Sequence, residues 1–502
     1  MSLPQSPLTV LTAGAYLVLI LLIGFWAARR TRTASDFFIA GKRIGLFVTA
    51  MATMSAAFSG FVFLGGPGLT YRLGVGSLWI VVPVGFTAGL LCWVVARPLR
   101  MLAEIREVYT IPDALFHRYG SRGVSGLGAL AIVLGTIAYL GAQMRALGLL
   151  LQAVFGLQSL LLAVLIGVAV LLVYGVLGGM VAGVYTDVVQ GSLMLVAALA
   201  VFDRALRVNG GWRQLTGSIA GSESFGEPFL QPLGTLSVLT AFGFFFVFGV
   251  GVLGQPQMLH KFYMLDDVRK LKWMPLVLGG SQTVCLLVWI GIGLAVPALV
   301  ARGALQPLTR ADDAAPLFLL SQVPEVLAGL LLAAVLAAIM STADSFMNIG
   351  AAALVRDLPR AVGRPVRREL FWSRVAVAVL AVISGALGLL YDDLIALLGT
   401  FAYGTFAAAL APALAIGLNW ARVTASAAAA SIATGLLLNL GFEFLARQNQ
   451  FDWLPASPLA AGALPSAAAL AGSFAVLFAV TWFDRAGASD PLEADLRALL
   501  EG

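Results

Sequence analysis

The sequence contains little charge and few residues with reactive or metal-binding side chains. Only 11% of its 502 residues are charged, 60% are hydrophobic, and it has two cysteines and two histidines. Cys92 and Cys285 both lie inside apolar runs, so they offer no disulfide framework and no metal site. The HExxH, CxxC and GxxxxGK[ST] patterns do not occur. Nothing therefore supports a soluble domain, a zinc enzyme or a P-loop ATPase.

Long apolar runs follow one another along the chain. A membrane-spanning helix needs about 20 apolar residues, and about 13 runs satisfy that rule. We therefore predict an all-α integral membrane protein, with a single transmembrane domain over 1–484 and a short cytoplasmic tail over 485–502. The predicted spans are 8–28, 45–70, 76–96, 125–152, 157–178, 188–206, 236–256, 275–300, 326–354, 372–391, 394–418, 422–444 and 462–483.

The loops between these runs alternate in charge. Basic loops remain on the cytoplasmic side of a membrane, which places the N-terminus outside and the C-terminal tail inside a cell (inner) membrane that the chain crosses many times. We assign the net charge of +6 to these topology signals rather than to nucleic acid. Membrane lipid is the expected surrounding, and no obligatory protein partner is evident. The basic loops are 29–43, 97–122, 260–273 and 356–369, and the loops with fewer basic residues are near 208–234, 303–325 and 446–460.

Glycine interrupts two of the predicted spans. The second reads SAAFSGFVFLGGPG over 55–68, and the seventh reads FGFFFVFGVGVLGQP over 242–256. Interruptions free backbone carbonyls, which at membrane depth must be buried or face a water-filled cavity. Paired interruptions in two halves of a chain indicate a transporter site between inverted repeats, and their separation leaves room for about five spans per repeat. Close helix packing through small residues is the alternative for each run taken alone.

A polar stripe lies within the ninth span, where AAIMSTADSFMN covers 337–348. Residues at i, i+3, i+4 and i+7 share a helix face. The hydroxyl and main-chain carbonyl oxygens of this stripe are hard ligands, which suit a cation that has lost part of its hydration shell. Serine and threonine often bond back to their own helix, but that alternative does not account for a carboxylate at this depth. The stripe comprises Ala338, Ser341, Thr342 and Ser345, with Asp344 beside it.

Two further ionisable residues lie within predicted spans. Asp187 is at the cytoplasmic start of the sixth span, where it is either a second acid on an ion route or an acid favoured by the helix dipole. Arg145 is near the external end of the fourth span. Its guanidinium could hold a substrate carboxylate through two hydrogen bonds, or it could extend to the outer interface. The first reading of Arg145 favours an amino acid or organic acid over a neutral sugar.

Four motifs occur in order: FVTAMATMSAAFSG with GGPG (47–60 and 65–68), GGMVAGVYTDVVQG (178–191), GQPQMLHKF (254–262), and MSTADS with LVRDL (340–345 and 354–358). In combination they resemble the sodium/solute symporter family, which includes sodium/proline and sodium/galactose symporters. The resemblance covers roughly 10–440. It implies a LeuT-like core of two inverted five-helix repeats, over 45–206 and 236–418, in a transporter that is not an enzyme. Sodium is then the coupling ion, and no cofactor is expected.

The resemblance also implies which residues form the sites. One sodium ion would be held by the main-chain carbonyls of Ser55, Phe58 and Ala338 and by the hydroxyls of Ser341 and Thr342. Some relatives hold a second sodium, which here would use Asp187, Asp344 and Ser345. The candidate solute-binding positions are Gly60, Phe61, Tyr139, Arg145, Phe248 and Gln255.

The chain departs from the proline-transporting branch of that family. The branch has Asp at the position of Ala57, Trp at Phe61, and Trp and Tyr at Phe248 and Val252. We predict sodium-coupled uptake of a small organic solute by alternating access, with an amino acid or organic acid favoured. A sugar solute and coupling to protons are the alternatives. A membrane enzyme or a sensor is less favoured, because acids and histidines do not cluster and the tail after 484 is short.

Overall fold

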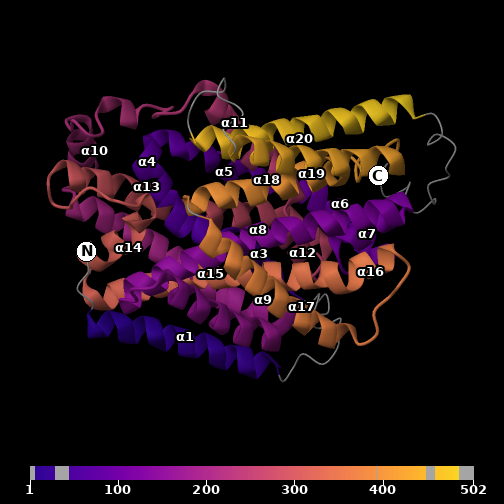
Figure 1. Cartoon of the computed structure of the whole chain (residues 1–502), viewed down its shortest axis with the longest axis horizontal. Helices are drawn as coiled ribbons and strands as arrows, with labels where there is room; N and C mark the ends of the chain where they lie inside the picture. Colours follow the sequence, from indigo (N-terminus) through magenta and orange to yellow (C-terminus); the bar gives the residue numbers. More distant parts are fainter. Residues whose placement is uncertain (1–5, 29–43, 392, 448–457, 485–502) are drawn as a thin grey trace.

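The computed structural model describes residues 6–28, 44–391, 393–447 and 458–484. Regular structure in these residues is helical, apart from one isolated bridge between Ile44 and Leu265. Most of the long helices run along the long axis of the molecule (Figure 1). Ten helical segments in the described residues are long and apolar enough to cross a membrane. The predicted runs fall on helical segments, so the all-α membrane architecture is confirmed, whereas the number 13 is not.

The helices have the following bounds. They are α1 (Pro7–Ala28), α3 (Leu46–Ala57), α4 (Gly66–Leu73), α5 (Val84–Leu91), α6 (Arg97–Ile105), α7 (Ile111–Tyr119), α8 (Arg122–Phe155), α9 (Leu160–Val208), α10 (Trp212–Ala220), α11 (Val238–Val250), α12 (Pro256–Phe262), α13 (Met274–Ala301), α14 (Ala314–Gln322), α15 (Glu325–Ala352), α16 (Leu358–Ala361), α17 (Glu369–Leu390), α18 (Ile395–Ala415), α19 (Ala425–Arg447) and α20 (Pro458–Phe483).

The connecting segments gather at two ends of the bundle. Figure 1 shows α10 and α14 at the end where α1 begins, on the left. It shows α7 and α16 at the opposite end, where α20 finishes. The first pair comes from the predicted loops with few basic residues, and the second pair comes from basic loops. The alternation of charge along the sequence thus corresponds to two physical ends of the molecule.

The predicted spans 157–178 and 188–206 form one helix, α9, which is 49 residues long. The expectation of two separate helices is therefore wrong. The sequence between them, VLGGMVAGVYTD, has no proline and no charged residue before Asp187, so nothing in it removes a helical hydrogen bond. The first part of α9 packs against α8 through Val164 and Gly148, and the second part packs against α3 through Gly191 and Met51.

Helix α15 lies in the interior of the bundle. Every residue from Leu331 to Ala352 is buried, and the helix contacts α1, α3, α8, α9 and α17. The polar stripe therefore faces other helices rather than lipid. Polar groups in such a place must be satisfied by protein, by water or by an ion.

The chain of the second predicted span breaks between α3 and α4. Helix α3 ends at Ala57, and Phe58 is extended, with φ −96° and ψ 105°. A π-helical turn over Phe61–Gly65 then leads into α4. The Ser59 hydroxyl accepts a hydrogen bond from the Phe61 N–H at 3.1 Å, which caps the new helical segment. This confirms the interruption predicted from the glycine pattern.

The chain of the seventh predicted span breaks between α11 and α12. A 3-10 turn over Gly251–Gly254 leads to Gln255, which has φ −81° and ψ 102°. Pro256 opens α12, because proline disfavours a helical conformation in the residue before it and fits the first turn of a helix. Helix α12 continues to Phe262. The prediction that a loop begins at 260 is therefore wrong, since His260 and Lys261 are helical and only 2% and 1% exposed.

Candidate functional site

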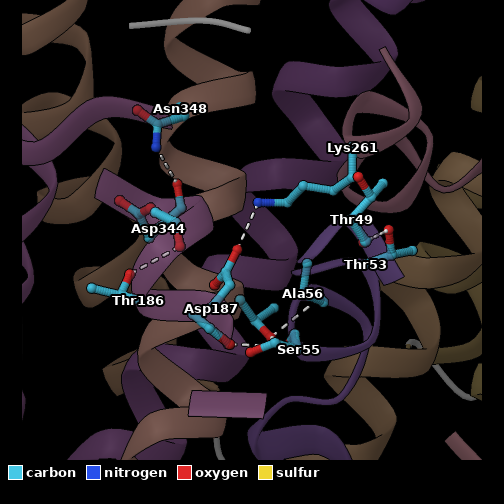
Figure 2. A network of polar contacts seen from close by, with 12 residues as sticks. Thr49, Thr53, Ser55, Ala56, Thr186, Asp187, Lys261, Asp344 and Asn348 are labelled. Carbon is cyan, nitrogen blue, oxygen red and sulfur yellow. Dashed lines mark hydrogen bonds and ion pairs between the residues drawn. The ribbon is translucent and has the colours of Figure 1, made fainter. Parts of the chain in front are cut away.

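The carbonyl end of α3 meets the hydroxyl stripe of α15. The Ser341 hydroxyl donates to the Ser55 carbonyl at 2.9 Å, and the Thr342 hydroxyl lies 3.4 Å from the same oxygen and 3.2 Å from the Ala56 carbonyl oxygen. All four residues are buried. Because α3 ends at Ala57, these carbonyls lack partners further along their own helix. The break therefore presents main-chain oxygens to side-chain oxygens from a distant part of the chain (Figure 2).

Four of the predicted residues lie together at this point. The Ala338 carbonyl accepts from the Ser341 hydroxyl at 3.4 Å, so Ser55, Ala338, Ser341 and Thr342 form one cluster of oxygens. The hydroxyl of Ser55 turns away to the sulfur of Met194. For Phe58 the only described backbone hydrogen bond is that of its N–H to the Met54 carbonyl at 2.9 Å.

This oxygen cluster is chemically suited to a small hard cation. Its members are carbonyls and hydroxyls, and it contains no nitrogen or sulfur ligand. The carbonyl end of a helix carries partial negative charge, and the C-terminal end of α3 points its last carbonyls at α15. Groups of three or more His, Cys, Asp or Glu side chains that could hold a metal ion do not occur in the described residues. A transition-metal centre thus has no support from the described side chains.

Two acids and a lysine lie inside the bundle near this cluster. The Lys261 ammonium of α12 donates to the Asp187 carboxylate of α9 at 2.8 Å, and each side chain is 1% exposed. Figure 2 shows the Lys261 side chain extended toward Asp187, with Asp344 of α15 beside them. Asp344 is close enough to interact electrostatically with both groups. The lysine is therefore an internal partner of the acids.

Several oxygens in this charged cluster have no hydrogen-bond partner among the described residues. They are one carboxylate oxygen of Asp187, one of Asp344 and the hydroxyl of Ser345. The main-chain carbonyl of Asp344 is engaged by the Asn348 amide at 3.0 Å. The structure thus brings the three predicted residues of a second cation site into one region and adds Lys261 to them.

The predicted solute positions around the first break are tightly packed. The Gly60 N–H donates to the Gln143 side-chain oxygen at 3.0 Å, and a Cβ at Gly60 would lie 2.7 Å from the Cβ of Ala146. The Tyr139 hydroxyl lies 3.4 Å from the Ser59 hydroxyl. The amide nitrogen of Gln143 has no hydrogen-bond partner in the described structure, although the residue is fully buried.

Aromatic rings connect the two breaks. Phe61 stacks on Phe248 with ring centroids 5.5 Å apart, and Phe248 stacks on Tyr403 of α18 at 4.4 Å. Trp289 of α13 meets the edge of Phe61 at 5.6 Å. Tyr139 belongs to a second stack, with Phe346 at 4.5 Å. Phe61 and Phe248 thus form one apolar wall, as is common in ligand sites.

The side chain of Gln255 forms hydrogen bonds within the second break. Its amide nitrogen donates to the carbonyls of Gly251 and Tyr403, both at 3.1 Å. Its amide oxygen accepts from Gln257 at 3.3 Å. Gln255 therefore bonds to one carbonyl of the broken segment, Gly251, and joins that segment to α18 through Tyr403.

Arg145 makes contacts that neither sequence interpretation included. It is 7% exposed, and its guanidinium donates to the main-chain carbonyls of Gly388 and Tyr391 at the end of α17. Asp312 lies near Arg145 and accepts from the Ile395 N–H at 3.0 Å, at the start of α18. These contacts hold the C-terminal end of α17 and the N-terminal end of α18. Burial raises the pKa of Asp312 to about 7, while the Ile395 N–H and Arg145 oppose that rise.

Sequence reasoning missed four residues of these clusters. Ala56 contributes a carbonyl through the backbone, which its side chain does not announce. The sequence places Lys261 in a predicted basic loop, although it belongs to the GQPQMLHKF motif. Gln143 and Tyr403 are single polar residues in apolar helices, and the position of Gln143 one helical turn after Tyr139 was the available signal.

Comparisons with known proteins show the family to which this chain is similar. A model of the sodium:solute symporter family matches residues 37–435. The sodium/proline symporter of Haemophilus influenzae is 29% identical over 443 residues, which cover 85% of this chain and 86% of that protein. The osmoregulated proline transporter of Bacillus subtilis is 28% identical over 443 residues, with 85% and 87% covered.

A solved structure of a sodium-coupled sialic acid symporter has the same fold. Its TM-score to this chain is 0.71, with 17% sequence identity, 94% of this chain covered and 98% of that chain. The likeness confirms the LeuT-like fold that the sequence predicted.

Proposed function

We propose a specific transport reaction for this chain, which belongs to the sodium:solute symporter family. In this reaction the protein couples the inward movement of sodium to the uptake of a small amino or imino acid, and proline is the first solute to test. The relatives from Haemophilus influenzae and Bacillus subtilis are named as proline transporters. Sodium coupling is supported by one observation. The carbonyls of Ser55 and Ala56 contact the hydroxyls of Ser341 and Thr342.

The oxygen cluster supports sodium because it joins two separate helices. Ser55 and Ala56 belong to α3, whereas Ala338, Ser341 and Thr342 belong to α15. A cation held between α3 and α15 stabilises the conformation in which these helices are together. A solute that binds the same conformation is then bound more tightly in the presence of sodium, and the effect is reciprocal. The membrane potential adds about 2.3 kcal/mol per charge per 100 mV to the driving force.

The packing around the first break supports a small, partly apolar solute. Phe61 and Phe248 provide an apolar wall, and Gln143 provides a buried amide nitrogen with no described partner. An amide N–H is suited to a carboxylate or carbonyl oxygen of a solute. The phenylalanines replace the tryptophans that the resemblance assigns to proline transporters, so a solute other than proline stays within the proposal. The role of Arg145 as a carboxylate ligand is less supported, because its described hydrogen bonds reach main-chain carbonyls.

The architecture supports alternating access between two repeats. We assign the repeats to 45–206 and 236–418, each containing one of the two breaks, and we place the protein in the inner membrane of a bacterium. The core repeats carry the oxygen cluster, whereas α19 and α20 lie beyond them and pack against each other and α18.

Uptake into proteoliposomes tests the proposal. The purified protein is reconstituted, and accumulation of proline, other small amino acids, organic acids and a sugar is measured with an inward gradient of sodium or of choline. We expect accumulation of an amino or imino acid that requires sodium. Equal uptake with choline, or uptake driven by a proton gradient alone, would show that the coupling ion is not sodium.

A single substitution then tests the solute site. Gln143→Glu keeps an oxygen for the Gly60 N–H and removes the amide donor. Because the new carboxylate repels a solute carboxylate, we expect the KM of the acid to rise about tenfold or more, while its uncharged amide derivative is affected less. An equal loss for the acid and the amide would argue against a carboxylate near Gln143.

A further inference from the structure

The charged cluster of Asp187, Lys261 and Asp344 contains its own cation. Lys261 comes from α12, the helical segment that follows the second break, and its ammonium donates to Asp187 at 2.8 Å. Each of the three side chains is 2% exposed or less. A lysine in the interior of a membrane protein is costly unless a partner neutralises it. The sequence assigned Asp187 to a possible second sodium ion, but in the structure a fixed positive charge already binds it.

The charges of this interior balance with one added cation. When both carboxylates are ionised, as an adjacent cation requires, two aspartates and one lysine sum to one negative charge, which one sodium ion at the nearby oxygen cluster neutralises. Asp344 is three residues after Ser341 on α15, so these two residues share a face of the helix. A second sodium ion would leave a net positive charge among buried groups, and isolated buried charge is strongly unfavourable.

We propose that the Lys261 ammonium takes the place of a second coupling ion, so that one sodium ion accompanies each solute molecule. The inference rests on the proposed function, since it concerns the stoichiometry of the same transport cycle. It also defines what Lys261 excludes. Without the ammonium, the oxygens of Asp187, Asp344 and Ser345 form an anionic set of hard ligands, which is suited to a sodium ion.

The number of bound ions gives the first test, and it does not require the solute to be known. Equilibrium binding of radioactive sodium to the purified protein counts the ions per molecule. We expect one. Two ions in the wild-type protein would overturn the inference and leave the proposed function intact. No saturable sodium binding would instead overturn the proposed function, and the inference with it.

The gradient that sodium sustains gives the second test. With the membrane potential held at zero, an about tenfold sodium gradient sustains an about tenfold solute gradient if one ion is coupled, and about hundredfold if two are coupled. We expect the smaller ratio for the wild type. The larger ratio would contradict the inference.

Lys261→Met tests whether the ammonium is what excludes the second ion. Methionine keeps much of the length of the side chain but removes its charge. We expect the variant to bind a second sodium ion and the solute ratio to rise toward about hundredfold. In the double variant Asp187→Asn/Lys261→Met, which also removes the negative charge left without its lysine partner, the count should return to one. A Lys261→Met protein that binds one ion, as the wild type does, would overturn the role assigned to Lys261.

The control variant loses the same positive charge, but at the surface instead of in the interior. Lys270 pairs with Asp266 at 2.5 Å, and its side chain is 41% exposed. Lys270→Met should therefore leave the sodium count at one. A purely structural tie between α12 and α9 would lower the yield of Lys261→Met without changing the number of ions bound by the folded fraction. If that variant does not fold, the wild-type count and ratio still decide the inference.

Discussion

The two interrupted helices differ in what their freed carbonyls contact. At the first break, the carbonyls of Ser55 and Ala56 meet hydroxyls from α15, a helix more than 250 residues away in sequence. At the second break, Gln255 turns back and satisfies a carbonyl of its own segment, Gly251, together with that of Tyr403. The first break thus presents oxygens to another helix, whereas the second is closed by its own amide side chain.

This difference separates two consequences of the same sequence signal. In both places a glycine-rich interruption leaves main-chain carbonyls without a helical partner. Inside a membrane such carbonyls must bond to another group or bind a ligand. What decides the outcome is the side chain nearby. Gln255 offers donors that satisfy carbonyls, and the second break then serves to position Phe248 and Lys261. The first break has hydroxyls across from it, which serve as donors or as ligands.

The largest expected effect is at the first break. Thr342→Ala removes one hydroxyl of the oxygen cluster, and the loss of one interaction with a charged partner costs about 1.5–3 kcal/mol. The sodium concentration for half-maximal uptake should therefore rise roughly tenfold to a hundredfold. The matched control is Thr400→Ala, because the Thr400 hydroxyl donates to the Ala396 carbonyl of its own helix at 2.8 Å. Equal sodium dependence in the two variants would remove the distinction between the breaks.

A smaller and different effect is expected at the second break. Gln255→Leu removes two hydrogen bonds, those of the amide to the Gly251 and Tyr403 carbonyls, which together contribute about 1–3 kcal/mol of stability. Thermal unfolding in detergent should show the loss, while the sodium requirement of the remaining uptake changes by less than about twofold. A steep rise in that requirement would mean that both breaks contribute to ion binding.

The smallest effect on sodium dependence is expected at Asp312, which lies outside both breaks. Its pKa in the folded protein is about 7, above its ordinary value of 3.8, because it is buried. The folded protein therefore binds a proton between these values that the unfolded chain releases, so this group lowers stability as pH rises through that window. Asp312→Asn should remove this slope in thermal unfolding measured from about pH 4 to pH 7. An unchanged slope would assign it to other groups.

Much of the first site could be predicted from the sequence, because its signals are periodic. The stripe of Ser341 and Thr342 follows helical spacing, and the glycines around Gly60 mark the break. Which carbonyls face the stripe could not be predicted. It depends on the residue at which α3 ends, and the extended conformation of Phe58 is not evident from its side chain. Ala56 was missed for that reason.

The cluster of Asp187, Lys261 and Asp344 was harder to predict, because a lysine at the end of an apolar run can lie in a loop or inside the bundle. A lysine just after a predicted span is typical of a cytoplasmic loop, so the sequence predicts that position for Lys261. The structure continues α12 to Phe262 and buries the side chain against Asp187. The separation of two spans within α9 failed for a related reason, since a small-residue segment without proline stays helical.

The most direct test of the account is sodium binding to purified protein that lacks both hydroxyls of the cluster. Equilibrium binding of radioactive sodium should be saturable in the wild type and in Thr400→Ala. In Ser341→Ala/Thr342→Ala the affinity should fall by about a hundredfold or more, because two ligands are removed from between α3 and α15. A double variant that binds sodium as tightly as the wild type would contradict the claim that these two helices hold the coupling ion.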